Sequence, residues 1–199
     1  MTAAQDRRAE RHAATKREVV DAAWRLARDR GLGGWTLRDV AAAVGMRAPS
    51  LYVYFDSKNA VYDAMFAEGY AELLARADVA ERAVQGAPPV EILRAAADLF
   101  VDFCIEDPPR HQLLFLRTLP GFEPSESSYA LARQALDRMA AVLAGAGAGA
   151  PEQVDLWTAL VSGLAAQQLS NDPGGDRWRR LVAPAVEMFA AAHLHTGRP

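Results

Sequence analysis

Apolar residues recur along most of this chain at the three- and four-residue spacing that places them on one face of an α-helix. Clusters of proline and glycine separate these stretches and mark the turns between them. Almost every segment therefore predicts helix, and we expect an all-α fold of about nine helices. The predicted helices span residues 15–30, 36–44, 49–55, 58–83, 90–106, 111–119, 129–144, 152–171 and 176–195.

The segment 36–58 predicts two short helices joined by a tight turn. Thr36 suits the N-cap of the first helix, and Val40 and Ala41 lie on its apolar face. Gly45 ends this helix, because glycine adopts the left-handed backbone conformation of a helix end with little strain. Pro49 suits the first turn of the second helix, where its missing N–H would have no partner. This arrangement is typical of a DNA-binding helix-turn-helix.

The second of these helices has one side that suits a core and another that suits DNA. Leu51 and Phe55 are expected to point inward as its apolar pair. Arginine can bond guanine edges, serine and tyrosine hydroxyls can reach phosphates, and alanine or proline can touch a thymine methyl. The alternative is that both helices belong only to the core of an all-α domain. The residues expected to contact DNA are Thr36, Arg38, Arg47, Ala48, Pro49, Ser50, Tyr52, Tyr54 and Lys58.

The order of residues in this segment resembles that of the TetR-type (TetR/AcrR) transcriptional regulators. The pattern LYxYFxSK stands at residues 51–58, preceded by TxRDVAxxxG at residues 36–45. The resemblance covers a block from about residue 15 to about residue 70, and its motifs are specific. Members of the family commonly have a small hydroxyl residue just after the turn, where this chain has Arg47. We therefore expect a helix cap to be lost there and a cationic contact to be gained.

Charge is distributed unevenly along the chain. The net charge of -3 combines +4 over residues 1–60, where eleven Lys or Arg face seven Asp or Glu, with -7 over the remainder. Because phosphate neutralisation dominates protein affinity for DNA, the basic end is the expected DNA-binding end. We expect a basic tail over residues 1–14, a helix-turn-helix domain over residues 15–60 with its motif at about 36–55, and a ligand-binding and dimerisation domain over residues 61–199.

Several other classes of protein fit this sequence poorly. No apolar run approaches the roughly 18 to 20 residues of a membrane-spanning helix, and the charged first residues do not predict a secretory signal. The single cysteine, Cys104, fits a reducing compartment, so we expect a cytoplasmic protein without membrane contact. An all-α enzyme that uses His111 with Cys104 is an alternative, but the chain has no HExxH, paired CxxC or phosphate-binding glycine loop. We expect no catalytic residues, no metal and no cofactor.

The last two predicted helices have more apolar surface than one small body needs. A symmetric pair of such hairpins would form a four-helix interface in a homodimer, as the family resemblance also implies. Two recognition helices could then contact two half-sites of an inverted-repeat operator, about 34 to 36 Å apart. The alternative is that both helices pack inward on their own subunit, and Pro184 is expected to bend the last helix or shift its start. The expected interface residues are Leu156, Leu160, Leu164, Trp178, Leu181, Val182, Val186 and Phe189.

Aromatic and flexible apolar residues are spread over several of the predicted helices and could line a ligand cavity. The resemblance implies a small-molecule effector there, whereas the alternative is an ordinary packed core. We expect a repressor that a small hydrophobic ligand releases from its operator. A ligand-independent dimeric DNA-binding protein is the alternative within the same class. The residues expected to bind the ligand are Phe66, Tyr70, Phe100, Phe103, Phe115, Met139, Trp157 and Gln167.

Overall fold

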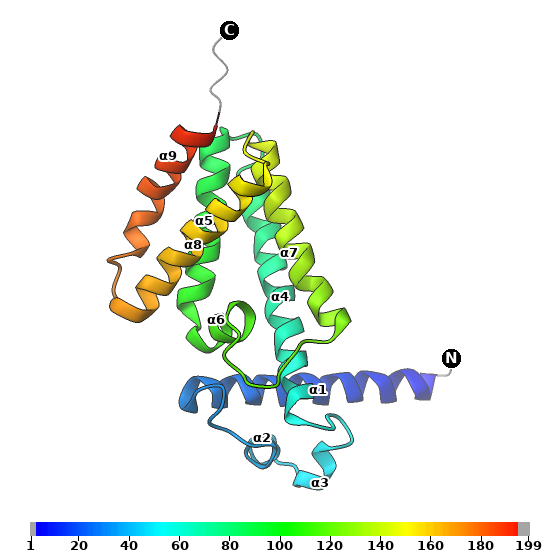
Figure 1. Cartoon of the computed structure of the whole chain (residues 1–199). Coiled ribbons are helices and arrows are strands. Elements are labelled where there is room, and N and C mark those ends of the chain that lie inside the picture. The colour runs from blue at the N-terminus through cyan, green and yellow to red at the C-terminus, as the bar shows by residue number, and fades with distance from the viewer. Residues whose placement is uncertain (1–2, 195–199) are drawn as a thin grey trace. The chain divides into compact units, whose positions relative to one another are not determined.

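The computed structural model describes residues 3–194. Within that range the chain forms nine α-helices and one short 3₁₀ helix, and it has no strand (Figure 1). The predicted all-α class is therefore confirmed. The elements are α1 (Ala3–Arg30), α2 (Leu37–Ala43), α3 (Ala48–Leu51), α4 (Lys58–Ala83), α5 (Pro89–Glu106), α6 (Pro108–Phe115), α7 (Glu126–Gly145), α8 (Pro151–Asn171), η1 (Arg179–Leu181) and α9 (Val182–His193).

The chain divides into two compact units. The first unit, here called the head, comprises Met1–Gly69 and Pro109–Tyr129. The second unit, here called the body, comprises Tyr70–Pro108 and Ala130–Pro199. The division falls inside α4, so the first three turns of this helix and most of α6 belong to the head rather than to the C-terminal unit.

Four helix starts differ from the sequence-based expectation: α6 and α7 each begin three residues early, at Pro108 and Glu126, and α1 and α9 differ more. Helix α1 begins at Ala3 rather than near residue 15, because the alanine, arginine, glutamine and glutamate residues at 3–14 are strong helix formers even without an apolar face. Helix α9 begins at Val182 rather than near residue 176, after the 3₁₀ turn of η1. Pro184 lies in the first turn of α9, where its missing N–H breaks no helical bond. The expectation that Pro184 shifts the start of the helix is met.

Helix α1 supplies much of the core of the head. Val19, Ala23 and Ala27 are fully buried along one face of the helix. Trp24 is buried beside them, and its indole Nε1 donates a hydrogen bond to Glu68 Oε2 at 2.9 Å. This bond joins α1 to the N-terminal half of α4, so the two helices fix each other's position inside the head.

Aromatic side chains form a second part of the core of the head. The rings of Trp35 and Tyr62 meet edge to face with centroids 5.1 Å apart, and Phe122 packs on both Tyr62 and Phe66. The Tyr62 hydroxyl donates a hydrogen bond to the Leu32 carbonyl, and burial raises the pKa of Tyr62 to about 12. The link between α1 and α2 is therefore attached to α4 through one buried tyrosine.

The connection between α6 and α7 is tied to the start of α4. Asn59 Nδ2 donates to the Gly121 carbonyl at 3.0 Å. The Asp63 carboxylate accepts from the Ser125 backbone N–H at 2.7 Å and from the Ser125 hydroxyl at 2.8 Å. These contacts explain why residues 116–125 belong to the head, although they lie far from the helix-turn-helix in sequence.

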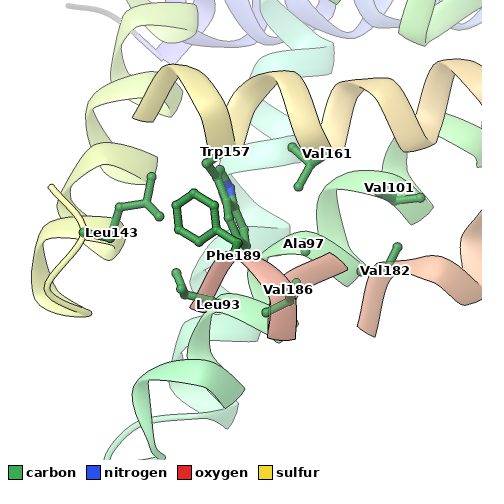
Figure 2. Close-up of a cluster of buried hydrophobic side chains, with 10 residues drawn as sticks. Leu93, Ala97, Val101, Leu143, Trp157, Val161, Val182, Val186 and Phe189 are labelled. Carbon is green, nitrogen blue, oxygen red and sulfur yellow. The ribbon is translucent and has the colours of Figure 1, made fainter. Parts of the chain in front are cut away.

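Helices α5, α8 and α9, with one residue of α7, enclose the core of the body (Figure 2). At its centre the rings of Trp157 and Phe189 meet edge to face with centroids 5.1 Å apart. The same periodic apolar positions that predict three helices thus meet in one cluster. Its buried members are Leu93, Ala97, Val101, Leu143, Ala148, Trp157, Val161, Val182, Val186 and Phe189.

Arginine residues link the helices of the body from outside this core. Arg138 on α7 bonds Glu81 through Nε and a terminal nitrogen at 2.5 and 2.8 Å, and it contacts Asp78 at 2.5 Å. Arg179 of η1 bonds both Asp98 and Asp102 of α5. In each case bonding to the carboxylates raises the pKa of the arginine, so the charge stays fixed at any pH of interest.

One buried amide organises the link between α8 and α9. Gln168 Oε1 accepts hydrogen bonds from the backbone N–H groups of Trp178 and Arg179 at 2.9 and 3.0 Å. Its Nε2 donates to the carbonyls of Asp172 and Gly175. The amide therefore uses both of its ends to hold the loop, which explains why this glutamine is buried while Gln167 is exposed.

None of the helices within residues 3–194 combines the length and the apolar character that a membrane span needs.

Candidate nucleic-acid interface

The first helix of the helix-turn-helix begins with a reciprocal cap. The Thr36 hydroxyl accepts a hydrogen bond from the Asp39 backbone N–H at 3.3 Å, and the Asp39 carboxylate accepts from the Thr36 N–H at 2.7 Å. Arg30 lies 3.4 Å from the same carboxylate. The Thr36 hydrogen bonds are the main cause of the lowered pKa of Asp39. The start of α2 is thus fixed by side chains that the sequence places three residues apart.

This cap makes the free energy of unfolding of the head depend on pH in the acidic range. A lowered carboxyl pKa contributes stability that is present above the ordinary pKa of about 3.8 and is lost as pH falls through the lower folded-state pKa. Asp39→Asn is therefore expected to reduce stability at neutral pH and to flatten its decline on acidification. Urea unfolding between about pH 2 and pH 7 measures the effect. Equal pH profiles for the wild type and the variant would assign the acid sensitivity to other carboxylates.

A glycine in the left-handed conformation joins the two helices. Gly45 has a φ of +69°, and the following Met46 N–H bonds the Ala41 carbonyl at 2.8 Å. A Cβ added at Gly45 would meet no atom within 4 Å. The backbone conformation, rather than a lack of space, therefore requires glycine here, as the sequence predicts.

The second helix, α3, has only four helical residues and depends on two apolar anchors. Leu51 is fully buried and Phe55 is 5% exposed, which confirms the predicted inward pair. The backbone N–H of Phe55 bonds the Leu51 carbonyl at 3.0 Å. At the N-cap position, Arg47 makes no side-chain capping bond and is exposed, so the expected loss of a cap is confirmed. Pro49 follows within the first turn.

Most of the residues expected to contact DNA lie on the outer surface of the head. Tyr52 is 56% exposed, and Ala48 and Tyr54 are half-buried. Thr36 is exposed, but its hydroxyl also donates to Asp39. Figure 1 shows α2 and α3 together on one side of the head. The remaining exposed members of the predicted set are Arg38, Arg47, Pro49 and Ser50.

Lys58 is half-buried and its ammonium group already has partners within the head. Its Nζ donates to the Gly33 carbonyl at 3.3 Å and lies 4.4 Å from the centre of the Trp35 ring and 5.3 Å from that of Tyr62. Partial burial lowers the pKa of Lys58. A structural role at the start of α4 thus exists beside the predicted DNA contact.

Two further side chains belong to this surface but were not among the predicted DNA contacts. Val53 is 73% exposed beside Tyr52, and its apolar side chain could meet a thymine methyl. His12 of α1 stacks near Tyr54 with ring centroids 4.8 Å apart. The family-like block begins at about residue 15, so it does not include His12. The start of α1 at Ala3 places His12 in this helix and beside Tyr54.

The residues expected to bind a ligand are divided between the two units. Phe66 and Phe115 belong to the head, and the other six belong to the body. In the body, Phe103 and Trp157 are fully buried, whereas Gln167 is exposed and accepts a hydrogen bond from Asn171. Tyr70 is buried, and Phe100 and Met139 are half-buried, the latter two against the core cluster.

The head contains an open cleft of about 340 Å³. It is lined by residues of α1 and α4 and by Phe55, one of the two apolar anchors of α3, and most of its surface is apolar. This cleft lies beside the helix-turn-helix. Its lining residues are Lys16, Arg17, Val20, Phe55, Ala64 and Glu68.

The residues expected at a dimer interface fall into three groups, which are buried, exposed and half-buried. Val182, Val186 and Phe189 are at most 5% exposed, because they belong to the body's own core. Leu156 is 53% exposed and Leu181 is 39% exposed. Helices α8 and α9 therefore pack inward on their own chain through one face and leave apolar residues on another. The half-buried members of the predicted set are Leu160, Leu164 and Trp178.

Among the described residues, no group of three or more His, Cys, Asp or Glu side chains is arranged to hold a metal ion. Cys104 is buried in α5. His111 is buried in α6, and desolvation lowers its pKa, so the imidazole is neutral at pH 7. The two residues lie in different units.

The capped first helix, the glycine turn and the exposed short second helix define an all-α protein of the helix-turn-helix class. The family model of the bacterial regulatory proteins of the tetR family matches residues 19–65. This segment includes the whole helix-turn-helix and the start of α4. Residues 19–65 therefore form a DNA-binding segment of the TetR family type.

Curated relatives and solved structures agree with this assignment. The negative transcriptional regulator IcaR of the biofilm operon icaADBC from Staphylococcus aureus is 40% identical over 48 residues, which are 24% of this chain and 26% of the relative. The match thus spans about a quarter of the length of that relative. A TetR/AcrR regulator from Thermobifida fusca has a TM-score of 0.64 at 21% identity, over 94% of this chain and all of the other.

A further solved structure with the same fold contains a ligand. The transcriptional regulator FadR from Bacillus subtilis, in complex with stearoyl-CoA, has a TM-score of 0.70 at 16% identity. The alignment covers 91% of this chain and 98% of that one. At 16% identity, the comparison shows that the two chains share a fold.

Proposed function

We propose that this protein is a dimeric transcriptional repressor that binds an inverted-repeat operator through its head and is released by a small hydrophobic ligand. The observation that carries the DNA-binding part is the outward face of residues 47–54, held by the buried Leu51 and Phe55. Arg47, Ser50 and the exposed tyrosine of this face are donors that suit base edges and phosphates. The match of residues 19–65 to the tetR family supports the same function.

Dimerisation is proposed through the outer faces of α8 and α9. Leu156 of α8 and Leu181 of η1, just before α9, are exposed, and Met188 of α9 is 64% exposed. Gly163 of α8 is exposed with no atom within 4 Å of an added Cβ, so a second helix could approach closely. Two copies joined through this surface would present two heads to two half-sites about 34 to 36 Å apart. The interface would use the exposed members of the predicted set rather than those in the core.

A ligand site in the body is proposed around Trp157. Its buried indole Nε1 has no hydrogen-bond partner among residues 3–194, which is an energetic cost that a ligand with an acceptor atom could remove. Half-buried Phe100 and Met139 pack against the same cluster and could move to admit an apolar group. The stearoyl-CoA bound by the FadR neighbour supports an apolar effector. A coupling of about 1 to 3 kcal/mol would weaken DNA binding about 5- to 150-fold.

The full burial of Phe103 and Trp157 favours a second candidate function. A body with a filled core would serve dimerisation alone, and the protein would bind DNA without an effector. The two candidate functions can be distinguished by adding long-chain acyl-CoA to the preformed protein–DNA complex. Release of the DNA supports the ligand-responsive repressor. Unchanged affinity in the presence of acyl-CoA bound to the protein supports the second candidate.

Mobility shift over a salt series tests the DNA-binding function. The purified protein is mixed with the DNA upstream of its own gene and with duplexes enriched by the protein from a random 40-base-pair library. We expect salt-sensitive binding to a short inverted repeat with two protomers per site. Failure to enrich any duplex, combined with binding that ignores sequence, would contradict the proposed function.

Arg47→Ala is expected to change the preference among operators. If Arg47 bonds a guanine in two places, its loss costs about 1 to 3 kcal/mol on operators with that base and much less on operators without it. Competition between duplexes that differ at single positions measures this. Arg25→Ala, an exposed arginine of α1 outside the proposed interface, is the matched control. An equal loss on every duplex would assign Arg47 to phosphate instead.

A further inference from the structure

The N-terminal half of α1 runs beside residues 54–55, which follow α3. His12 stacks near Tyr54 with centroids 4.8 Å apart, and Lys16 Nζ lies 5.2 Å from the centre of the Phe55 ring. Residues spaced by four share one face of a helix, so Arg8 lies on the same face one turn further toward the N-terminus. Figure 1 shows this half of α1 extending past the rest of the head on the side where α3 lies.

Basic side chains share the face of α1 that meets residues 54–55. At 100° per residue, Arg8, His12 and Lys16 fall within one narrow sector of the helix. Asp6 and Glu10 fall on roughly the opposite sector. The side that meets residues 54–55 is therefore basic and has no acidic side chain, while Arg7, Arg11 and Arg17 lie on the other sides of the helix. We call the face made by Arg8, His12 and Lys16 the basic stripe.

We propose that the basic stripe is a second DNA-binding surface, and that Arg8 binds backbone phosphates outside the major-groove segment contacted by residues 47–54. This inference rests on the DNA-binding function proposed above and adds a partner surface to it. Tyr54 is the link, because it belongs to the predicted DNA face and also contacts the stripe through His12.

The dimensions of the helix fit this role. Arg8 lies four residues, or about 6 Å, beyond His12 along α1, and each DNA strand carries one phosphate about every 3.4 Å along the duplex axis. The exposed guanidinium can therefore reach a phosphate one or two positions beyond those near Tyr54. Arginine is well suited to such a contact, since its planar fork can bond two phosphate oxygens at once. Each protomer would cover flanking DNA in this way.

The test compares Arg8→Gln with Arg25→Gln, which removes the same charge from an exposed position on roughly the far side of α1. The probe is the duplex that the protein enriches from a random 40-base-pair library. Two protomers each lose one phosphate contact, so Arg8→Gln is expected to reduce the slope of log affinity against log salt by about 2. Between about 50 and 200 mM salt, the wild type would then lose about tenfold more affinity than the variant. Arg25→Gln is expected to keep the wild-type slope.

Shortening the duplex provides a second readout. Removal of the base pairs that flank the inverted repeat is expected to weaken the wild type and Arg25→Gln severalfold and to leave Arg8→Gln unchanged. If Arg8→Gln matches Arg25→Gln in both slope and flank dependence, the basic stripe is not a DNA surface, although the helix-turn-helix still is one. If the protein enriches no duplex, the proposed function fails and this inference fails with it. Circular dichroism confirms that both variants retain their helices.

Discussion

Leu51→Ala is expected to destabilise the head by about 2 to 5 kcal/mol and to abolish specific DNA binding. Leu51 is fully buried, and α3 has only four helical residues, so few other contacts can hold it. An isolated helix of this length has no stability of its own in water. The cavity left by the truncated side chain would remove both the transfer free energy of the methyl groups and the surface against which α3 packs.

Urea unfolding at fixed protein concentration measures this loss, and mobility shift on the enriched duplex measures its functional effect. Val53→Ala is the matched control for stability, because Val53 is 73% exposed two residues along the chain. Its free energy of unfolding is expected to stay within about 0.5 kcal/mol of the wild type. A Leu51→Ala protein that keeps both its stability and its DNA affinity would show that α3 is held by contacts other than this anchor.

Trp157→Ala is expected to cost about 3 to 5 kcal/mol of stability in the body. The indole is fully buried at the centre of the core cluster and lies edge to face against Phe189 (Figure 2). Removing it opens a large cavity and loses an aromatic pair. The substitution also removes a buried, unpaired Nε1 donor, which offsets only part of the loss of stability. The loss should therefore lie near the upper end for a single core substitution.

The same urea titration measures this variant. Leu136→Ala on α7 is the control, because Leu136 is 54% exposed. If the body has the core that Figure 2 shows, only the tryptophan variant shifts the midpoint strongly. A tryptophan variant as stable as Leu136→Ala would mean that the centre of the body is loosely packed.

The helix-turn-helix could be predicted because its determinants are local. Thr36 and Asp39 form a cap over three residues, Gly45 supplies a positive φ, and Leu51 and Phe55 are one helical turn apart. Each of these signals acts within a few residues of its position in the sequence. Their order is therefore visible without knowledge of the rest of the fold.

The roles of α8 and α9 could not be predicted in the same way. Periodicity shows that a helix has an apolar face, but it does not show which neighbour covers that face. Val186 is covered by the body's own core, whereas Leu156 on α8 is left exposed. The start of α9 depends on the hydrogen bonds of Gln168 to residues about ten positions away, and no local pattern marks them. The helical residues before 15 have no apolar pattern, so no local signal indicates the contact between His12 and Tyr54.

The position of Lys58 has a consequence for the entropy of DNA binding. A lysine side chain normally loses up to about 2 kcal/mol of rotamer freedom when it is immobilised. In this head the loss occurs on folding, because the ammonium is already held over Trp35 and bonded to Gly33. An ammonium has three N–H donors, and the bond to Gly33 uses one of them. Lys58 can therefore offer the remaining donors to a phosphate as a preorganised group, without the ordering cost that a free surface lysine would incur.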